Sequence, residues 1–375
     1  MEGKRTGSVS LLIAGIFALG CGAQPPATEG EPEVPIVTLM PVDSIGIEMG
    51  DSNYVLGAVE GVAYGPDGTI AVLDCALSCI RIYSPEGEFL RQIGRRGNGP
   101  GEMQSVAFLG ISEDGSIFLA GEGSEVLGLH RYDYASGGWL GSTPGSGTPP
   151  TCIEGSSDSS YVRKDVELDV STGEPLVVMR VARYRPGSEE PLAVYLERTF
   201  PFDPSDYARL IDVIWYGVDI AADFEGTVWI SERSTTEAVA VRYGPDGAET
   251  GRVTLDLEPV LRTPEELEME RLILTSKAIA MDSDEFPPIE PDPCKPMISG
   301  LELDGEGNLW VQLGGPSTPT FEVFSPEGGH LYTAVLGQER ADGASWRFFI
   351  DRHGILAYAE DPADGYQKVY ILEPR

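Results

Sequence analysis

Histidine is the side chain that most often carries acid–base and metal chemistry near neutral pH, and this sequence has little of it. The 375 residues include 60 aspartates and glutamates but only three histidines, His130, His330 and His353. This composition argues against a histidine-built metal site, whereas calcium needs only oxygen ligands. Beyond the N-terminal leader there is no Gly-x-Ser-x-Gly elbow, phosphate-binding loop or His-Glu-x-x-His helix. We therefore name no catalytic residue and predict no cofactor, with calcium as the alternative.

Four aspartates stand where a carboxylate either binds a ligand or forms a turn. Asp223, Asp304 and Asp351 precede three predicted turns at comparable positions, and Asp74 follows a predicted inner strand. Aspartate commonly accepts hydrogen bonds from the backbone two residues further on, so we interpret the first three as turn-forming residues. The sequence identifies no partner for Asp74.

One glycine-rich loop carries the candidate residues for ligand contact. Residues 94–101 include Arg95, Arg96 and Asn98, which we predict to lie on a ligand-binding face. The loop lacks a lysine at the spacing of a phosphate-binding loop, which favours a tight connection between two repeats.

Tryptophan rings act either as stacking platforms for ligands or as parts of a core. The candidates for stacking are Trp139, Trp215 and Trp346. Trp229 and Trp310 occupy matching places in two repeats, which favours burial.

The first 20 residues predict a signal peptide. Lys4 and Arg5 precede an apolar run over residues 9–19 that is too short to span a bilayer. Residues 18–21, Ala-Leu-Gly-Cys, resemble the bacterial lipobox, which implies that Cys21 is lipidated. We therefore predict a lipid-anchored protein of the cell envelope, periplasmic or at the cell surface. Because Gly22 is not aspartate, the outer membrane is the expected site in a host with two membranes. An ordinary secreted protein with an incidental Cys21 is the alternative.

Residues 21–35 predict a flexible tether, since they are rich in Pro, Ala, Thr and Glu and lack apolar periodicity. Beyond the tether four cysteines remain, an even number that favours two disulfides in an oxidising compartment. The spacing favours a Cys75–Cys79 staple across one hairpin loop and a long-range Cys152–Cys294 pair. A metal site on Cys75 and Cys79 is the alternative, and zinc there would need two further ligands.

A repeat fills the remaining residues, 36–375. Each unit has a strand, a turn at Asp-Gly or a close variant, a second strand, and then a further hairpin that turns at Pro-x-Gly. Residues 61–72 and 81–87 are clear copies of the two hairpins. From Gly68 to Gly115 is 47 residues, and from Gly307 to Gly354 is 47 again. Two hairpins give four antiparallel strands, which is one blade of a β-propeller.

Irregular spacings and the chain ends complete the expected fold. The 111 residues from Gly115 to Gly226 leave room for a degenerate unit near residues 152–200. Thr263 followed by proline and two glutamates predicts a helical insertion near residues 263–282 that lies over one face. Residues 368–372 would be the third strand of the last unit, and residues 36–47 would supply the fourth. The expected fold is all-β, a six-bladed propeller whose last blade is closed by the N-terminal strand.

Residues 61–103 resemble an NHL-type repeat, including Ile-Gly-Arg-Arg-Gly-Asn-Gly-Pro-Gly-Glu-Met at residues 93–103, which links two blades. At the level of blades, nearly the whole mature chain is similar to six-bladed propeller lipoproteins of two-membrane bacteria, most of which have no assigned activity. The resemblance implies the fold and leaves the ligand open, because propellers host binders, lyases and hydrolases alike.

The formal net charge of -34 repels nucleic acid, so we expect no nucleic-acid partner. We expect a monomeric scaffold, held in a membrane by its lipid anchor, that binds a protein, peptide or glycan. The alternative is a propeller hydrolase or lyase with an oxygen-ligated metal in the central channel. Inward-facing carboxylates from three or more blades would favour the enzyme, and an apolar or water-filled channel with an elaborated loop face would favour the binder.

Overall fold

The computed structural model describes residues 34–123, 127–144, 151–155, 158–171, 173–203, 205–280, 289–337, 345–360, 362 and 365–375. These residues belong to one compact unit, Val34–Arg375. The predicted signal peptide, Cys21 and most of the predicted tether lie outside the described residues. The helices that are described are all too short or too polar to cross a lipid bilayer.

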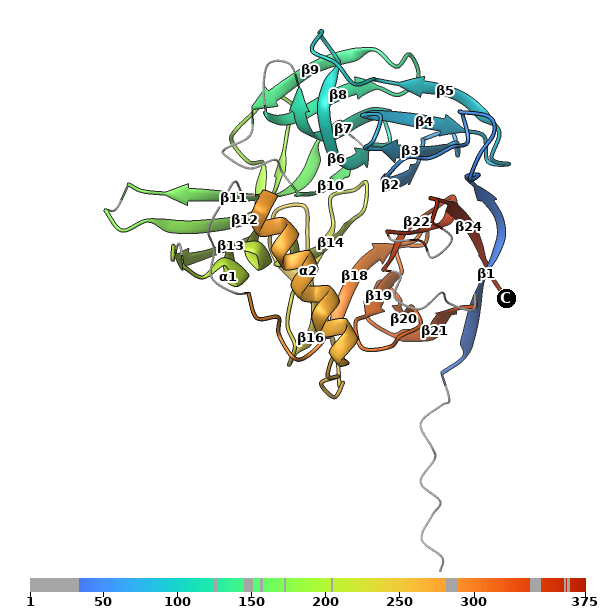
Figure 1. The fold of residues 1–375 in the computed structure, drawn as a ribbon. Helices are drawn as coiled ribbons and strands as arrows, with labels where there is room; N and C mark the ends of the chain where they lie inside the picture. The colour runs from blue at the N-terminus through green and yellow to red at the C-terminus, as the bar shows by residue number, and fades with distance from the viewer. Residues whose placement is uncertain are drawn as a thin grey trace, which may run out of the picture. The chain divides into compact units, whose positions relative to one another are not determined.

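The unit has an all-β, propeller-like fold built from antiparallel meanders of four strands (Figure 1). The strands of the four separate sheets are β2 to β5 (Val59–Tyr64, Ile70–Asp74, Cys79–Tyr83, Phe89–Ile93), β6 to β9 (Met103–Ile111, Ser116–Gly123, Leu127–Asp133, Trp139–Pro144), β10 to β13 (Thr151–Gly155, Tyr161–Asp169, Leu176–Tyr184, Ala193–Pro201) and β14 to β17 (Val218–Ala222, Val228–Glu232, Ala238–Tyr243, Glu249–Leu255). In every sheet the strands follow one another in chain order, as consecutive hairpins require.

A fifth sheet has eight strands because the N-terminal strand lies between a run of four strands and a run of three. Its members in chain order are β1 (Ile36–Ile45), β18 to β21 (Ile298–Leu303, Leu309–Leu313, Thr320–Phe324, His330–Leu336) and β22 to β24 (Trp346–Asp351, Gly354–Ala359, Val369–Pro374). Strand β1 pairs antiparallel with β24, which confirms the predicted closure of the last group by the N-terminal strand. The other edge of β1 pairs in parallel with β21. The structure therefore has five sheets, where the sequence predicted six separate blades.

Strands β2, β6, β10, β14, β18 and β22 are each the first strand of a run of consecutive hairpins, and we call each run a group. These first strands contact one another in a closed cycle. Buried apolar side chains fill the spaces between consecutive groups. Leu73 and Val106 pack between the first two groups, and Val62 and Leu356 pack between the last group and the first. Because each group buries both faces against its neighbours, the core is divided among the interfaces around the ring.

Turn chemistry explains both the regular hairpins and the degenerate one. Gly68 and Gly226 have φ of +80° and +92°, the left-handed conformation that the predicted turns require. In the group β10 to β13, which lies where the degenerate unit was predicted, Ser159 takes this conformation with φ +62°. No Asp-Gly pair marks this turn in the sequence because a serine performs the role of glycine.

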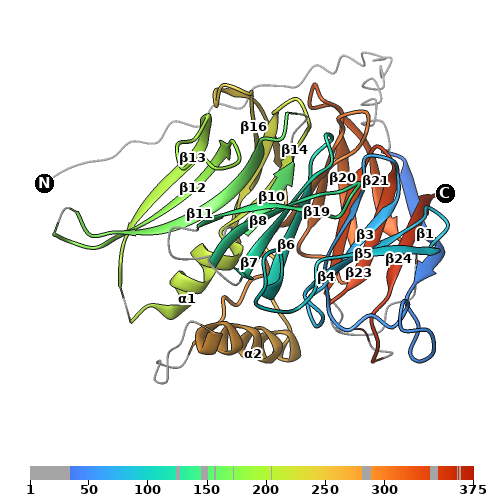
Figure 2. The same ribbon diagram turned by 90° about the horizontal axis from the view of Figure 1, so that it is seen from above.

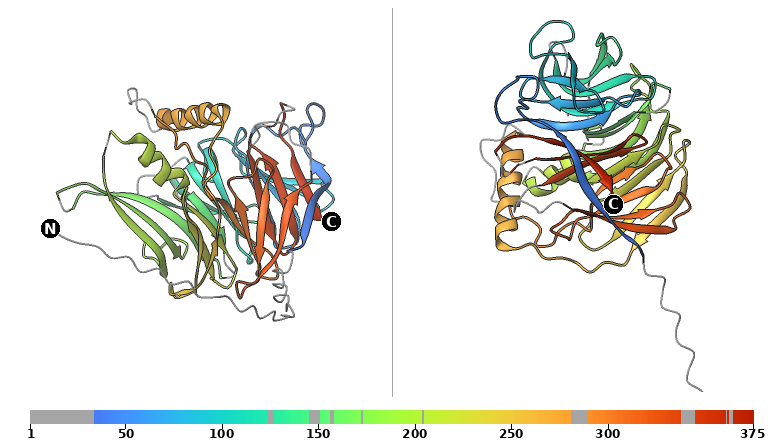
Figure 3. Two further views of the ribbon diagram at one scale, coloured as in Figure 1. Left: turned by 90° about the horizontal axis from the view of Figure 1, so that it is seen from below. Right: turned by 90° about the vertical axis from the view of Figure 1, so that its right-hand side faces the viewer.

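Helix α2 (Pro264–Ala280) lies where the helical insertion was predicted, across the strand ends on one face of the unit (Figures 2 and 3). Its start is a capping box: the Thr263 hydroxyl accepts from the Glu266 amide at 3.2 Å, and the Glu266 carboxylate accepts from the Thr263 amide at 2.9 Å. Leu274 and Ala278 pack on Ile211, at the end of the short helix α1 (Tyr207–Ile211). A π-helical turn, η1 (Asp212–Tyr216), follows α1.

The cysteines depart from the expected disulfides. Cys75, Cys79 and Cys294 are free thiols, so the Cys75–Cys79 staple is not formed and Cys294 is unpaired. In the strand register Cys79 lies opposite Asp74, and Cys75 is one residue further on, where side-chain direction alternates. The Cys75 thiol donates instead to the Val106 carbonyl oxygen at 2.9 Å, in the next group. The side chain of Cys152 lies outside the described residues.

Candidate binding pocket

A cavity of about 760 Å³ lies at the centre of the ring. The first strand of every group contributes to its wall, and α2 contributes a set of residues three or four positions apart. The lining residues from α2 are Glu266, Met269, Glu270, Ile273 and Lys277. One face of the helix therefore lies over the end of the cavity at which the first strands begin.

Charged side chains of the first strands line the cavity, because each first strand is the edge strand of its group and lies next to the cavity. Glu60, Glu154, Asp219 and Glu302, from β2, β10, β14 and β18, all line the cavity. Their immediate neighbours, such as Val59 and Ile153, are buried in the interfaces between groups. An edge strand also has backbone groups without a partner strand. The Ile350 amide of β22 donates across the channel edge to Glu302 at 3.2 Å.

Burial raises the pKa values of these four carboxyl groups, and repulsion by other carboxylates adds to it at Glu60 and Glu302. Burial raises the pKa of Glu154 to about 8 and that of Asp219 to about 6. For Glu302 burial is the main cause and the negative charges of Glu154, Asp351 and Asp219 add to it, so its pKa lies well above the ordinary value. The pKa of Glu60 is raised by burial and by Glu360. Part of this carboxyl set is therefore protonated at neutral pH.

Cationic side chains gather toward the end of the cavity under α2. Arg347 of β22 donates to Glu360 at 2.7 Å, just after β23 ends. The Lys277 ammonium lies 5.5 Å from the centre of the Trp215 ring. Near the same end are the ion pairs Arg233–Glu270 at 3.3 Å and Lys295–Glu266 at 2.7 Å. These contacts attach α2 to the rim by charge as well as by packing.

The opposite end of the ring is crossed by contacts between hairpin turns. Arg352, in the β22–β23 turn, pairs with Glu113 in the β6–β7 turn at 2.8 Å. Its guanidinium also lies over the ring of Phe224, in the β14–β15 turn, at 5.4 Å. These turns belong to three alternate groups, so their contacts span the axis. Because the first strands run from the α2 end to these turns, the turns close the base of the cavity and α2 lies over its other end.

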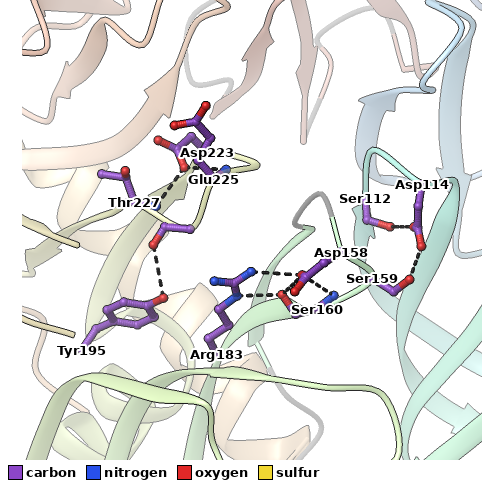
Figure 4. A network of polar contacts seen from close by, with 11 residues as sticks. Ser112, Asp114, Asp158, Ser159, Ser160, Arg183, Tyr195, Asp223, Glu225 and Thr227 are labelled. Atoms are coloured by element: carbon purple, nitrogen blue, oxygen red, sulfur yellow. Dashed lines mark hydrogen bonds and ion pairs between the residues drawn. The ribbon is translucent and has the colours of Figure 1, made fainter. Parts of the chain in front are cut away.

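Polar contacts also lock neighbouring turns together at this base (Figure 4). Asp114 accepts hydrogen bonds from Ser112 in its own turn and from Ser159 in the next group. Arg183 pairs with Asp158 at 3.0 Å. The Tyr195 hydroxyl donates to the Gly226 carbonyl oxygen of the following group at 3.3 Å. These contacts thus join the turns of three consecutive groups at the base.

Several predicted site residues fall outside the cavity. Arg95, Arg96 and Asn98 are absent from its lining. Arg95 is exposed and pairs with Glu102, while Arg96 donates to the Gln104 carbonyl oxygen at 3.2 Å. Asn98 bonds the Gln104 side chain. The loop is therefore organised around its own contacts.

Two of the three tryptophans predicted as stacking platforms line the cavity, and the third does not. Trp215 and Trp346 line the cavity, whereas Trp139 lies half-exposed on an outer strand. Trp229 and Trp310 are each only 3% exposed, which confirms their assignment to the core.

The four aspartates have clear roles. Asp223 accepts from the Glu225 and Thr227 amides at 2.9 and 2.8 Å. Asp304 and Asp351 form the same kind of turn, which confirms their interpretation. Asp74 is fully buried, pairs with Arg81 at 3.2 Å, and accepts from the Gly57 amide.

The histidines serve local structure. His330 bonds Glu322 at 2.7 Å, and buried His130 bonds Ser142 at 2.7 Å. His353 packs beside Tyr64. Within the described ranges, no three His, Cys, Asp or Glu side chains come close enough together to hold a metal ion.

The four wall carboxylates were missed in the sequence. Each is a charged residue next to buried apolar residues in the first strand of its unit, and Arg347 shares this pattern in β22. Comparing the first strands of all units position by position is the signal that could have found them.

The comparisons with known proteins establish the fold alone. No protein-family model and no curated protein matches the sequence. Among solved structures, a member of the duf4221 family from Bacteroides vulgatus has TM-score 0.51 and 10% identity, covering 90% of this chain and 98% of its own. A protein from Bacteroides fragilis that carries the name of an exported protein has TM-score 0.50 and 12% identity, and the match covers 90% of this chain and 95% of that protein. A gluconolactonase from Xanthomonas campestris has TM-score 0.45 and 13% identity, and the match covers 91% of this chain and 98% of that protein.

Proposed function

We propose that this chain is an exported, lipid-anchored, six-bladed propeller that binds a small polar ligand in its central pocket. The observation that carries the proposal is the cavity of about 760 Å³, a size typical of small-molecule sites, whose wall combines aromatic rings with charged groups. A fragment of a peptide or glycan has the size and polarity that such a wall accommodates.

The count of six blades rests on how β1 joins the eight-stranded sheet. Strand β1 pairs with β24 from Leu39 to Ile45, which is most of its length. If β1 is therefore grouped with β22, β23 and β24, the remaining strands β18 to β21 form a sixth set of four. The closed cycle of first strands supports the same count. In this assignment β1 is the outermost strand of the last blade.

The binding proposal is tested by filling the pocket. The full chain with Cys21→Ser is screened by thermal shift against amino acids, short peptides, mono- and disaccharides, organic acids, amines and calcium. A ligand of the pocket raises the Tm because it binds the folded state preferentially. In the same background Ile273→Trp, which replaces an aliphatic side chain of the cavity wall by a larger indole ring, should abolish the shift.

The matched control is Leu272→Trp, the adjacent residue of α2, which is exposed and lies outside the cavity lining. It should leave the shift unchanged. If no compound raises the Tm, or if both variants respond to the ligand equally, the pocket is not the binding site.

A channel enzyme is the second candidate, and one observation favours it. Carboxylates from four groups face the cavity, and Glu154, with its pKa raised to about 8, is a carboxylic acid able to donate a proton near neutral pH. Chemical change of a bound ligand in the wild type, lost in Glu154→Gln with binding retained, would favour this candidate.

A further inference from the structure

We propose that the ligand of the central pocket carries an organic ammonium group, which the carboxylates at the closed end recognise. This inference rests on the proposed pocket function and adds the chemical class of the ligand. It starts from the balance of charge along the cavity wall.

Most cations of the wall are already matched by carboxylates. Arg347, Lys295 and Arg233 form ion pairs with Glu360, Glu266 and Glu270. Setting these pairs aside, the described wall retains four carboxyl groups, at Glu60, Glu154, Asp219 and Glu302, and one ammonium, at Lys277. Four acids against one base leave an excess of three acidic groups facing the cavity.

The excess is unevenly distributed along the channel. Lys277 projects from α2 and lies beside Trp215, at the α2 end of the cavity. Glu154 and Glu302 are each the next-to-last residue of their strands, which end at the turns of the closed base. The cation of the wall and its deepest carboxylates are thus at opposite ends, and the base is where a positive group of a ligand would be favoured.

The deep carboxylates lack internal compensation for their charge. Among the described contacts, Glu302 accepts one backbone hydrogen bond, from Ile350. Among the described residues neither Glu154 nor Glu302 has an ion pair with a basic side chain, and the negative charge of Glu154 raises the pKa of Glu302. A cation placed near both would remove this repulsion and would replace the protons that the pair otherwise binds.

The chemistry of the wall selects an ammonium group over the other classes of ligand. The acidic side chains do not converge at metal-ligand distances in any described cluster, whereas an ammonium donates three hydrogen bonds to acceptors that stand further apart. Phe108 and Phe349 also line the cavity and provide an apolar surface for methylene groups. An anionic ligand would meet the acidic base with the same sign of charge.

The test uses three probes with the same six-carbon chain and different ends: 1,6-diaminohexane, 1,6-hexanediol and adipate. Dissociation constants are measured by calorimetry at pH 7.5 on the full chain with Cys21→Ser. The expected result is binding of the diamine at least about tenfold tighter than of the diol or the diacid, since a hydrogen bond to a charged group is about twice as strong as a neutral one.

Glu154→Gln and Glu302→Gln should each weaken diamine binding by about tenfold, because the amide keeps the shape and loses the charge. Glu48→Gln, at an exposed residue outside the cavity lining, is the matched control and should bind like the parent. Thermal melts of each variant establish that it is folded.

Binding of the diol or adipate that is as tight as that of the diamine, or tighter, overturns the ammonium inference. The inference also fails if neither Glu154→Gln nor Glu302→Gln changes the dissociation constant of the diamine. Calcium that binds more tightly than the diamine and depends on the same residues would also overturn it, in favour of a metal site. If the diamine does not bind but the broader panel yields a ligand whose binding Ile273→Trp abolishes, the ammonium inference fails and the proposed pocket function stands. If neither experiment yields such a ligand, the proposed function itself fails.

Discussion

Replacement of Glu154 by glutamine should change how the stability of the protein depends on pH. Burial raises the pKa of this carboxyl from 4.5 to about 8 in the folded protein. Between these two values the folded state holds a proton that the unfolded state releases, so stability is lost as pH rises. Glutamine keeps the shape of the protonated acid and cannot ionise, so the variant lacks this loss.

The size of the effect follows from the proton difference. One proton gives a slope of at most about 1.4 kcal/mol per pH unit, or about 4 kcal/mol from pH 5 to pH 8. Glu154 is partly accessible from the cavity, and we take about half of this, roughly 2 kcal/mol, as the expected change. For a unit of roughly 340 residues, an unfolding entropy of about 0.7 kcal/mol per kelvin converts this to about 3 °C.

The assay is a set of thermal melts at half-unit steps from pH 5 to pH 8. The Tm of Glu154→Gln should equal that of the wild type near pH 5 and exceed it by about 3 °C at pH 8. Glu48→Gln, at an exposed position, is the control and should follow the wild type throughout. A constant difference between Glu154→Gln and the wild type across the range would refute the reasoning, because it would mean that Glu154 ionises normally in the folded protein.

Two further predictions concern the anchor and the base of the pocket. Cys21→Ser should move the protein from the membrane fraction to the soluble fraction and abolish labelling by a radioactive fatty acid; a variant that stays membrane-bound would contradict the lipid anchor. Arg352→Ala removes the pair with Glu113 and the contact with Phe224, both partly exposed, and should lower stability by about 0.5–1 kcal/mol. Hydrogen exchange should quicken in the three turns that Arg352 connects, and unchanged exchange there would show that it does not hold the base.

Local chemistry made a large part of the fold predictable. The capping box at Thr263 requires only a threonine, a proline and a glutamate at fixed spacing, and α2 begins there. The turns at Gly68 and Gly226 can be predicted from the sequence because glycine adopts positive φ without strain. At Ser159 the same conformation is held by a residue that gives no such signal, so that hairpin was located only from the spacing of its neighbours.

The sequence by itself determined the repeat, its turns, the helical insertion and the strand that closes the last group, because each depends on residues close together in the chain or on the period of the pattern. Only the tertiary structure decided the pocket. Glu154 and Glu302 are separated by 148 positions in the chain. The charge of Glu154 affects the pKa of Glu302 only because the first strands close into a ring. The same closure brings Arg352 to Glu113. Their electrostatics depend on distance and burial in the folded unit, which residue types and spacing leave undetermined.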